Sequence, residues 1–521
     1  MGKEKPNSVK TLASKSKQST NRTKVLIIIA LIILTILVKL PIVNTPYMDD
    51  AAFWYVSKAM LIQEQNLDPI FRGKGLPSAL EEIDARKHPW LQNYISDFTH
   101  PPMFYEILAT SYMLFGYSVQ VSHIIIIFLS SLGIVFAYLL GKELYGNKAG
   151  LFAAIGLLFT PIVFTQIGRI YPEILLMSFS LMAFYFMLKE NKLMYIITGG
   201  VLVLLKEQGI IAILAILFYI LIKEISDEQL FGKWNKETKK KIIGTISKLL
   251  TYAIPLFILI GWYIYHYIKT GLLLYADNYS KQAIGFEIIQ NILFYVKFIL
   301  IDQYRFILTI IIILAIVWKK YEIRKIEVSM WLMVLGYVLL MAWSNQGYLR
   351  HIVPAIPILF LMGGGMIQKI RKEKLIILGI GILVVVLSVS IYHTPTDYNY
   401  EENMRYKDLV DLQIQTVDFI QTDYSNRLVW VDLFTYLDMG YPYMGYVEES
   451  MNIGLIPTDY LKFPEAKKSF TDNFAKGDLV VENSLYTYEK RNDYVVIRNL
   501  DLKLIETFEK NQDFIKIYEV N

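Results

Sequence analysis

The sequence predicts a polytopic α-helical membrane protein with a smaller water-soluble domain at its C-terminal end, and three observations predict it. Hydrophobic residues make up 54% of the 521-residue chain and the mean hydropathy is +0.39, which is too apolar for an ordinary soluble protein. Stretches long enough to cross about 30 Å of hydrocarbon recur through the first three quarters of the chain. Beyond Tyr392 the sequence turns polar, which indicates a domain boundary.

Residues 1–24 form a basic tail in front of the first apolar run. Lysine and arginine recur through this tail, and residues 25–43 are almost entirely apolar. The run is long and no small-residue cleavage site follows it, so we expect a retained anchor and not a cleaved signal peptide. A basic tail before a first span indicates a cytoplasmic N-terminus.

Ten further apolar segments follow, which gives roughly eleven spans between residues 25 and 392. They occupy residues 120–140, 149–167, 172–188, 193–205, 209–222, 249–268, 291–317, 328–343, 352–367 and 375–392. If the spans alternate from a cytoplasmic N-terminus, the basic connections all fall on the cytoplasmic side. Because the number of spans is odd, residues 393–521 are then expected to be extracytoplasmic.

Two segments interrupt this pattern. Residues 101–116 are apolar enough for a short helix, but a full crossing would place the later basic loops outside. We therefore expect this helix to dip into the membrane within the first external loop, residues 44–119. Residues 193–222 contain two arms that are short for spans, with Lys206 and Glu207 between them. That junction is either a charged external turn or a place where a lysine meets an anionic lipid headgroup.

Composition excludes several kinds of chemistry. The chain has no cysteine, so disulfides, thiolate metal sites and cysteine nucleophiles are excluded. The formal charge of +5 is unevenly placed and does not indicate nucleic-acid binding. A pump or channel usually carries ionisable residues inside its spans, whereas here polar residues gather in the predicted external loops. The pattern favours chemistry at the outer membrane surface.

The first external loop contains two adjacent carboxylates, Asp49 and Asp50, where a helix is expected to begin. Apolar side chains recur at helical spacing through residues 51–65. One interpretation is a helix cap, in which the carboxylates meet the positive end of the helix dipole. The other is a catalytic pair, in which one carboxylate acts as a general base and the other as an electrostatic or metal-binding partner. The residues alone leave both interpretations open.

Four more polar motifs follow this pair in the predicted external segments. They are Thr99-His100-Pro101-Pro102, Gly168-Arg169-Ile170-Tyr171-Pro172-Glu173, Leu205-Lys206-Glu207 and Tyr348-Leu349-Arg350-His351. In this order the five motifs resemble the glycosyltransferase C superfamily, in the branch of protein O-mannosyltransferases and the aminoarabinose lipid A transferase. Two departures stand out: Asp50 replaces the more common glutamate, and Ala52 replaces a basic residue.

The resemblance implies a membrane glycosyltransferase that uses a polyprenyl-phosphate-linked sugar donor. The sugar is a hexose or pentose, and the acceptor is a protein, a lipid or a glycan at the outer face of the cell membrane. Such a reaction needs a base for the acceptor and cations for the leaving phosphate. Asp49 is the candidate base, with Asp50 beside it. The candidate phosphate ligands are Arg169, Lys206, Arg350 and His100.

Glu173 has several roles open to it. Three roles are compatible with the sequence: orienting Arg169, binding a divalent metal ion, or forming a structural salt bridge. No other cofactor is indicated. For an outward-facing arginine, a simple anchor at the membrane interface is an alternative to phosphate binding.

Residues 393–521 are predicted to form a small α/β domain. A helix is expected at residues 403–422, and strands at residues 427–432, 479–482, 494–497 and 514–520. Residues 436–446 are rich in tyrosine, which would suit stacking on a sugar but also suits an ordinary core or interface.

Two other functional classes remain, a lipid or solute transporter and a noncatalytic scaffold. A transporter is typified by polar or broken spans that meet at the bilayer midplane, often with an internal repeat. Apart from the Lys206 junction the sequence shows neither. A scaffold would make Asp49 dispensable, so substitution of this residue separates a scaffold from an enzyme.

Overall fold

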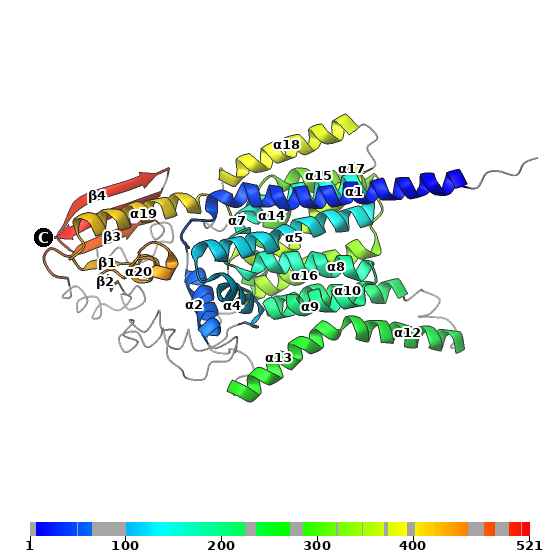
Figure 1. Ribbon diagram of the computed structural model, residues 1–521, viewed down its shortest axis with the longest axis horizontal. Coiled ribbons are helices and arrows are strands. Elements are labelled where there is room, and N and C mark those ends of the chain that lie inside the picture. The colour runs from blue at the N-terminus through cyan, green and yellow to red at the C-terminus, as the bar shows by residue number, and fades with distance from the viewer. Residues whose placement is uncertain are drawn as a thin grey trace, which may run out of the picture.

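The computed structural model describes most of the chain as a layer of helices with a small sheet beside one end (Figure 1). The described residues are 7–48, 50–64, 100–224, 236–270, 285–318, 321–345, 347–368, 373–392, 402–456, 474–484, 500–511 and 513–521. Asp49 and the predicted strand at residues 494–497 therefore lie outside the described residues.

Helices, most of them apolar, form the body of the molecule (Figure 1). In chain order they are α1 (Asn7–Lys39), α5 (Val119–Tyr145), α6 (Asn147–Leu158), α7 (Pro161–Gln166), α8 (Pro172–Leu188), α9 (Lys192–Leu205), α10 (Ile210–Glu224), α12 (Lys236–Tyr252), α13 (Ile254–Thr270), α14 (Phe286–Leu300), α15 (Arg305–Val317), α16 (Lys325–Ser344), α17 (Pro357–Ile367) and α18 (Glu373–Tyr392). Short 3-10 turns connect some of them: η1 (Leu40–Ile42), η3 (Glu207–Gly209) and η4 (Leu349–Ala355). Each of the predicted apolar segments contains helix.

By length and composition, four described helical segments can each cross a membrane. They are Arg22–Ile42, Val119–Tyr145, Lys325–Ser344 and Leu349–Ile367. Two bent pairs raise the number to six: Ile242–Tyr252 with Ile254–Lys269, bent by 47°, and Phe286–Leu300 with Arg305–Val317, bent by 88°. The other apolar helices are shorter than this criterion requires. The count of eleven spans therefore stays a prediction.

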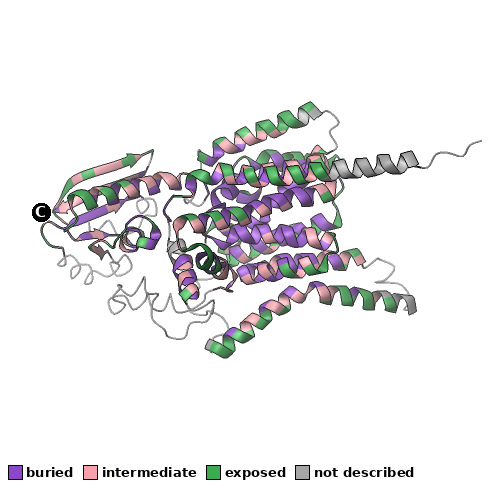
Figure 2. Ribbon diagram, viewed as in Figure 1, coloured by how far each residue is buried: buried purple, intermediate pink, exposed green. Residues whose placement is uncertain are grey.

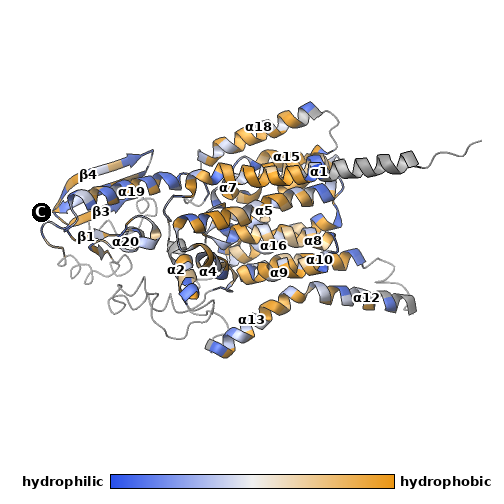
Figure 3. Cartoon of the chain, viewed as in Figure 1, coloured by the Kyte–Doolittle hydropathy of each residue, from blue (hydrophilic) through white to orange (hydrophobic). Residues whose placement is uncertain are grey.

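The outer surface of the helical layer is apolar. The central helices are largely buried, whereas α12, α13 and α18 expose much of their length (Figure 2). The exposed positions include large hydrophobic side chains, for example Phe257, Ile264, Ile310 and Val385. Figure 3 shows that hydrophobic residues run along much of the helical body. In water such a surface would favour aggregation, so this pattern indicates a bilayer as the surrounding solvent.

Two short helices lie at the end of the bundle that faces the sheet, which we call the sheet-side end (Figure 1). They are α2 (Asp50–Glu64) and α4 (Met103–Phe115), which pack against each other. The predicted helix at residues 101–116 is thus present, starting after the two prolines. One face of α4 is buried and includes Phe104, Tyr105, Leu108 and Tyr112.

The C-terminal region is a five-stranded mixed sheet with flanking helices. Its elements are α19 (Tyr406–Asp423), β1 (Val429–Val431), α20 (Leu433–Gly440), η5 (Pro442–Met444), β2 (Ile453–Leu455), β3 (Leu479–Asn483), β4 (Leu502–Lys510) and β5 (Asp513–Val520). The strand order is β2-β1-β3-β5-β4, in which β1 pairs in parallel with β2 and β3, and the remaining pairs are antiparallel. Helix α19 packs on β4 and β5.

The sheet region is joined to the bundle by direct contacts. The Tyr47 amide donates to the Met444 carbonyl over 3.0 Å, and the Tyr117 hydroxyl donates to the Tyr443 carbonyl. The segment that follows α18 also returns to the bundle, because the Met404 amide donates to the Ile391 carbonyl over 2.9 Å. These contacts place the C-terminal region directly over the connections that carry the polar motifs.

Candidate functional site

Three connections at the sheet-side end bring polar residues together. They are residues 167–171 between α7 and α8, residues 206–209 between α9 and α10, and residues 345–356 between α16 and α17. Each interrupts a pair of apolar helices, so its polar side chains lie at a helix end, where backbone groups also need partners. Helix α8 packs against both α9 and η4, which fixes the three connections beside one another.

A buried charge cluster lies at this junction and consists of Glu173, Lys206 and His351. The Glu173 carboxylate is fully buried, and its Oε1 atom lies 2.7 Å from Lys206 Nζ and 2.7 Å from His351 Nδ1. Lys206 Nζ is also 3.4 Å from His351 Nδ1. An ionised carboxylate oxygen only accepts hydrogen bonds, so a hydrogen bond between His351 and Glu173 has the proton on Nδ1, with the ring nitrogen donating. The other oxygen of Glu173, Oε2, has no hydrogen-bond partner within the described part of the chain.

Two predicted arginines form a continuous stack with three tyrosines, which we call the arginine–tyrosine stack. The Arg169 guanidinium carbon lies 4.8 Å from the centre of the Tyr406 ring and 5.1 Å from that of Tyr171. The Arg350 carbon lies 4.4 Å from the Tyr171 ring centre and 4.4 Å from that of Tyr348. Tyr171 therefore contacts both guanidinium groups. A cation over an aromatic face is attracted by the ring, which helps to hold both guanidinium groups beside Tyr171.

Helix α2 connects the predicted carboxylate pair to this stack. Helix α2 begins at Asp50, whose side chain is not among those described, and Tyr55 follows five residues later, about 7.5 Å along the helix axis. The Tyr55 ring contacts Tyr171, Phe104 and Tyr105, with ring centres 6.4, 5.0 and 5.7 Å away. Burial and the neighbouring Glu173 charge raise the pKa of Tyr55, so its hydroxyl stays neutral at physiological pH.

His100 pairs with Glu207 at the edge of the charge cluster. The Nδ1 atom of His100 lies 3.1 Å from both carboxylate oxygens of Glu207. Burial by itself would disfavour the Glu207 carboxylate, but the charge and hydrogen bond of His100 outweigh it and lower the pKa of Glu207. The pair joins the start of α4 to the turn that carries Lys206.

Two further residues complete the sheet-side end, and the motifs did not include them. Lys39, at the end of α1, is fully buried, and its Nζ atom lies 3.8 Å from the Phe164 ring centre and 4.0 Å from Met404 Sδ. His123 lies between two backbone carbonyls, with Nε2 2.9 Å from the Thr45 oxygen and Nδ1 against the Gly168 oxygen. A neutral imidazole has one N–H, so only a protonated ring donates to both carbonyls.

The sequence contained a signal for each residue that we missed. Lys39 is a lone charge at the end of an apolar run, and an ionisable residue there is a functional candidate by default. His351 stands beside Arg350 within a motif that we had singled out. His123 is a solitary histidine near the start of an apolar segment, and its partners lie 78 and 45 residues away, beyond the reach of local patterns.

The structure brings most of the predicted site residues to one end of the bundle. Arg169 and Arg350 share the Tyr171 ring, and Glu173 pairs with Lys206. His100 reaches this group through Glu207, while Asp49 and the Asp50 side chain lie outside the described residues. Among the described residues, no group of three or more histidines and carboxylates is placed to hold a metal ion.

Comparison with known proteins yields one family match and several structural ones. Residues 99–250 match the family model described as dolichyl-phosphate-mannose-protein mannosyltransferase. No curated protein sequence matches the chain.

The structure is similar to crystal structures of ArnT from Cupriavidus metallidurans. The apo structure superposes with a TM-score of 0.55 at 12% identity, covering 96% of this chain and 98% of that one. The structure bound to undecaprenyl phosphate gives a TM-score of 0.53 at 13% identity, with 95% and 97% coverage. At such identities the likeness concerns the fold. Together, the family match and the shared fold confirm the resemblance to the glycosyltransferase C superfamily that the five motifs indicated.

Proposed function

We propose that this protein is a membrane glycosyltransferase that moves a sugar from a polyprenyl-phosphate-linked donor to an acceptor at the sheet-side face of the membrane. The observation that carries this proposal is the arginine–tyrosine stack, in which two guanidinium groups flank one buried ring beside a buried charge cluster. Arginine suits phosphate recognition because its planar fork of donors matches phosphate oxygens. The match to mannosyltransferases and the fold shared with ArnT support the same reaction class.

In the proposed reaction, an acceptor hydroxyl or amine attacks the anomeric carbon of the donor sugar. The bond between that carbon and the phosphate oxygen breaks, and polyprenyl phosphate leaves with the bonding electrons. Asp49 accepts the acceptor proton, and Asp50 assists it. Arg169 and Arg350 stabilise the charge that develops on the leaving phosphate. None of these steps involves a metal ion.

The remaining predicted residues take supporting roles in this proposal. Lys206 and Glu173 neutralise each other over 2.7 Å, so Lys206 acts chiefly through the charge balance of the site. His351 fixes the same Glu173 oxygen from the other side. His100 pairs with Glu207, next to Lys206 in the chain, and is a further candidate for contact with the phosphate.

The topology belongs to the same proposal. Residues 1–24 are a cytoplasmic tail, residues 25–392 a membrane module of about eleven spans, and residues 393–521 an extracytoplasmic domain. In this arrangement the first external loop, residues 44–119, carries the base. The acceptor, whether protein, lipid or glycan, reaches the site from the side of the C-terminal domain.

The test is donor consumption by the purified full chain in liposomes. Radiolabelled polyprenyl-phosphate mannose, glucose and aminoarabinose are each supplied as donor, and release of free polyprenyl phosphate and sugar-labelled acceptor is measured. Arg350→Gln should lower kcat/KM by about 10- to 100-fold, since a charge-assisted contact to phosphate is lost. Arg427→Gln is the matched control, because Arg427 pairs with Glu519 in the sheet region.

Two results would remove the proposal. Equal donor turnover by Arg350→Gln and Arg427→Gln would show that the stack does not contact the donor. If the wild-type chain transfers no sugar but moves the intact lipid-linked donor between leaflets, the protein is a transporter.

A further inference from the structure

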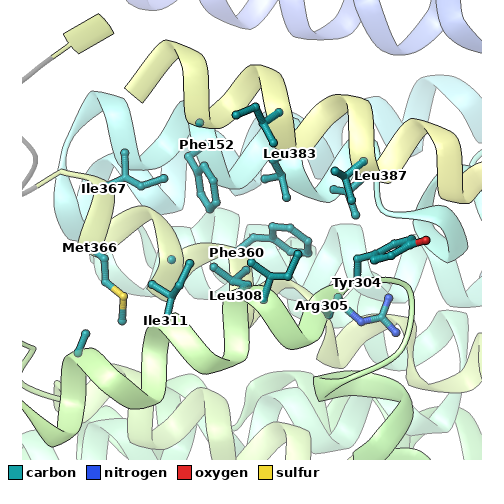
Figure 4. Close-up of a pocket in the computed structure, with 16 residues that line it drawn as sticks. Phe152, Tyr304, Arg305, Leu308, Ile311, Phe360, Met366, Ile367, Leu383 and Leu387 are labelled. Carbon is teal, nitrogen blue, oxygen red and sulfur yellow. The ribbon is translucent and has the colours of Figure 1, made fainter. Parts of the chain in front are cut away.

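A narrow apolar groove lies among four helices, on residues separate from those of the arginine–tyrosine stack and the charge cluster (Figure 4). It has a volume of 470 Å³ and lies between α6, α15, α17 and α18. Its walls include Phe152, Leu308, Phe360, Leu383 and Leu387. No residue of the stack or of the charge cluster lines it.

The groove opens on the outer surface of the helical layer. Three isoleucines that line it, Ile307, Ile311 and Ile382, are 45%, 49% and 56% exposed. This layer is membrane-embedded, so the medium outside the opening is hydrocarbon. An apolar space that communicates with lipid tails is filled by a tail, because an empty one forfeits the dispersion contacts of its lining.

One end of the groove is polar, but the charged group there, the Arg305 guanidinium, donates its hydrogen bonds to other protein atoms. Arg305 and Tyr304 lie there, towards the sheet-side end (Figure 4). The Arg305 side chain donates to the Ile299 carbonyl over 2.9 Å, to Gln303 Oε1 over 2.7 Å, and to the Phe298 carbonyl. Because these donors are directed at the protein, the described residues that line the groove offer no free cation for a headgroup phosphate, and the groove suits a hydrocarbon chain alone.

The length of the groove fits one leaflet of a bilayer. Its lining on α15 runs from Arg305 to Ala315, ten residues apart, which is about 15 Å at 1.5 Å per residue. That is about half of the roughly 30 Å hydrocarbon thickness. We propose that the groove is a binding site for one fatty-acyl chain of a bilayer phospholipid from the leaflet on the sheet side.

Two glycines on α18 make the proposal testable with a matched pair of variants. A Cβ atom built on Gly379, which lines the groove, has no neighbouring atom within 4 Å, so a larger side chain there would occupy the groove. Gly381 is equally unobstructed but does not line the groove. Both glycines are exposed on the same helix, so the two substitutions carry the same helical cost.

The experiment uses photoactivatable phosphatidylethanolamine with a diazirine in one acyl chain. The full chain is placed in nanodiscs containing this lipid and irradiated, and crosslinked peptides are mapped by mass spectrometry. Labelling of residues 304–315 and 379–387 should exceed that of the exposed helix α13 in the wild type. Gly379→Phe should lower the groove labelling by about tenfold, because its ring displaces several buried methylene groups. Gly381→Phe should leave it unchanged.

Two outcomes would overturn the proposal. Equal groove labelling in the two variants would mean that the lipid contacts the helices without entering the groove. Loss of wild-type labelling on addition of unlabelled undecaprenyl phosphate, but not of unlabelled phosphatidylethanolamine, would assign the groove to a polyprenyl chain instead. If melting curves show that Gly379→Phe does not fold, Leu383→Trp fills the same groove and replaces it. None of these readouts depends on glycosyl transfer.

Discussion

Two fully buried carboxylates, one at each end of the bundle, have opposite surroundings. Glu173 lies in the first turn of α8 at the sheet-side end, and Glu327 lies in the first turn of α16 at the far end, where α5 finishes. Glu327 accepts hydrogen bonds from the Tyr145 and Tyr321 hydroxyls on one oxygen and from the Arg324 amide over 2.7 Å on the other. Its hydrogen-bond partners among the described residues are thus neutral donors, and both oxygens are used.

Glu173 differs from Glu327 in the charge of its partners and in having one oxygen without a hydrogen-bond partner among the described residues. Lys206 and His351 crowd one oxygen, while the other has no partner in the described residues. A fully satisfied carboxylate at a helix start stabilises the helix, as Glu327 does for α16. A carboxylate held between a lysine and a histidine, with a spare buried oxygen, is costly for stability alone and is typical of a site. The comparison therefore supports a structural role for Glu327 and agrees with the proposed site role of Glu173.

The largest expected effect tests the sheet-side end as a catalytic site. Asp49→Asn keeps the size of the side chain and most of its hydrogen-bonding capacity, but it removes the ability to accept a proton. Transfer from the polyprenyl-phosphate donor should fall by about 10²- to 10⁴-fold, the usual contribution of a general base. Folding and membrane insertion should survive, because asparagine caps a helix about as well as aspartate.

Asp50→Asn and Asp423→Asn complete that series. The first should be milder than Asp49→Asn, since Asp50 assists its neighbour, and the second, on the sheet-side helix α19, should be silent. Full transfer by Asp49→Asn would rule out this residue as the base. Full transfer by the double variant at positions 49 and 50 would remove the main reason to place catalysis in this loop.

A second prediction replaces each of the two compared carboxylates by glutamine in a separate variant. Glu173→Gln leaves Lys206 without its partner, so we expect kcat/KM to fall by at least about tenfold and stability to fall by about 3 kcal/mol. Glu327→Gln should lower the melting temperature but leave kcat/KM per folded molecule unchanged. Melting in detergent and donor turnover are measured on the same preparations. The comparison fails if both variants lose activity in the same proportion.

A third prediction concerns His123, which ties the loop before Asp49 to the turn before Arg169. His123→Phe removes the ring nitrogens that lie against the two carbonyls, and with them the hydrogen bond that a neutral imidazole donates to one of the two. We expect kcat to fall by about tenfold with a smaller change in KM, because misplaced groups slow the chemical step more than binding. His123→Gln retains a donor and should recover part of the loss. A purely structural role would instead lower the yield of folded protein in both variants and leave kcat per folded molecule intact.

The helices were predictable from sequence because apolar runs of span length leave few alternatives in a bilayer. The helix after the two prolines, the helix at α19 and the strands β1, β3 and β5 were also predicted near their observed bounds. Positions of charged side chains in the site were less predictable. Glu173 pairs with residues 33 and 178 positions away, and no local pattern links them. The tyrosines of the arginine–tyrosine stack likewise depend on packing between distant segments.

The smallest expected effect concerns a third buried carboxylate, Glu402, in the segment that follows α18. It is 1% exposed, its Oε2 atom lies 3.5 Å from Gln303 Nε2, and its Oε1 atom has no partner in the described residues. Burial, only partly offset by Arg305, raises the pKa of Glu402 to about 8. An unfolded glutamate has a pKa of about 4.3, so the folded chain binds this proton more tightly.

The sign of the pH dependence follows from that difference. Below about pH 4.3, Glu402 is protonated in both states and does not lower the free energy of unfolding. As the pH rises from there to about 8, the free energy of unfolding falls, and above 8 it falls no further on account of Glu402. Glu402→Gln cannot ionise, so at pH 9 it should melt a few degrees above the wild type, while the two should agree near pH 4. Differential scanning fluorimetry in detergent across this range measures the difference, with the exposed Glu448→Gln as control. A difference between Glu402→Gln and the wild type that is constant with pH would contradict the raised pKa of Glu402.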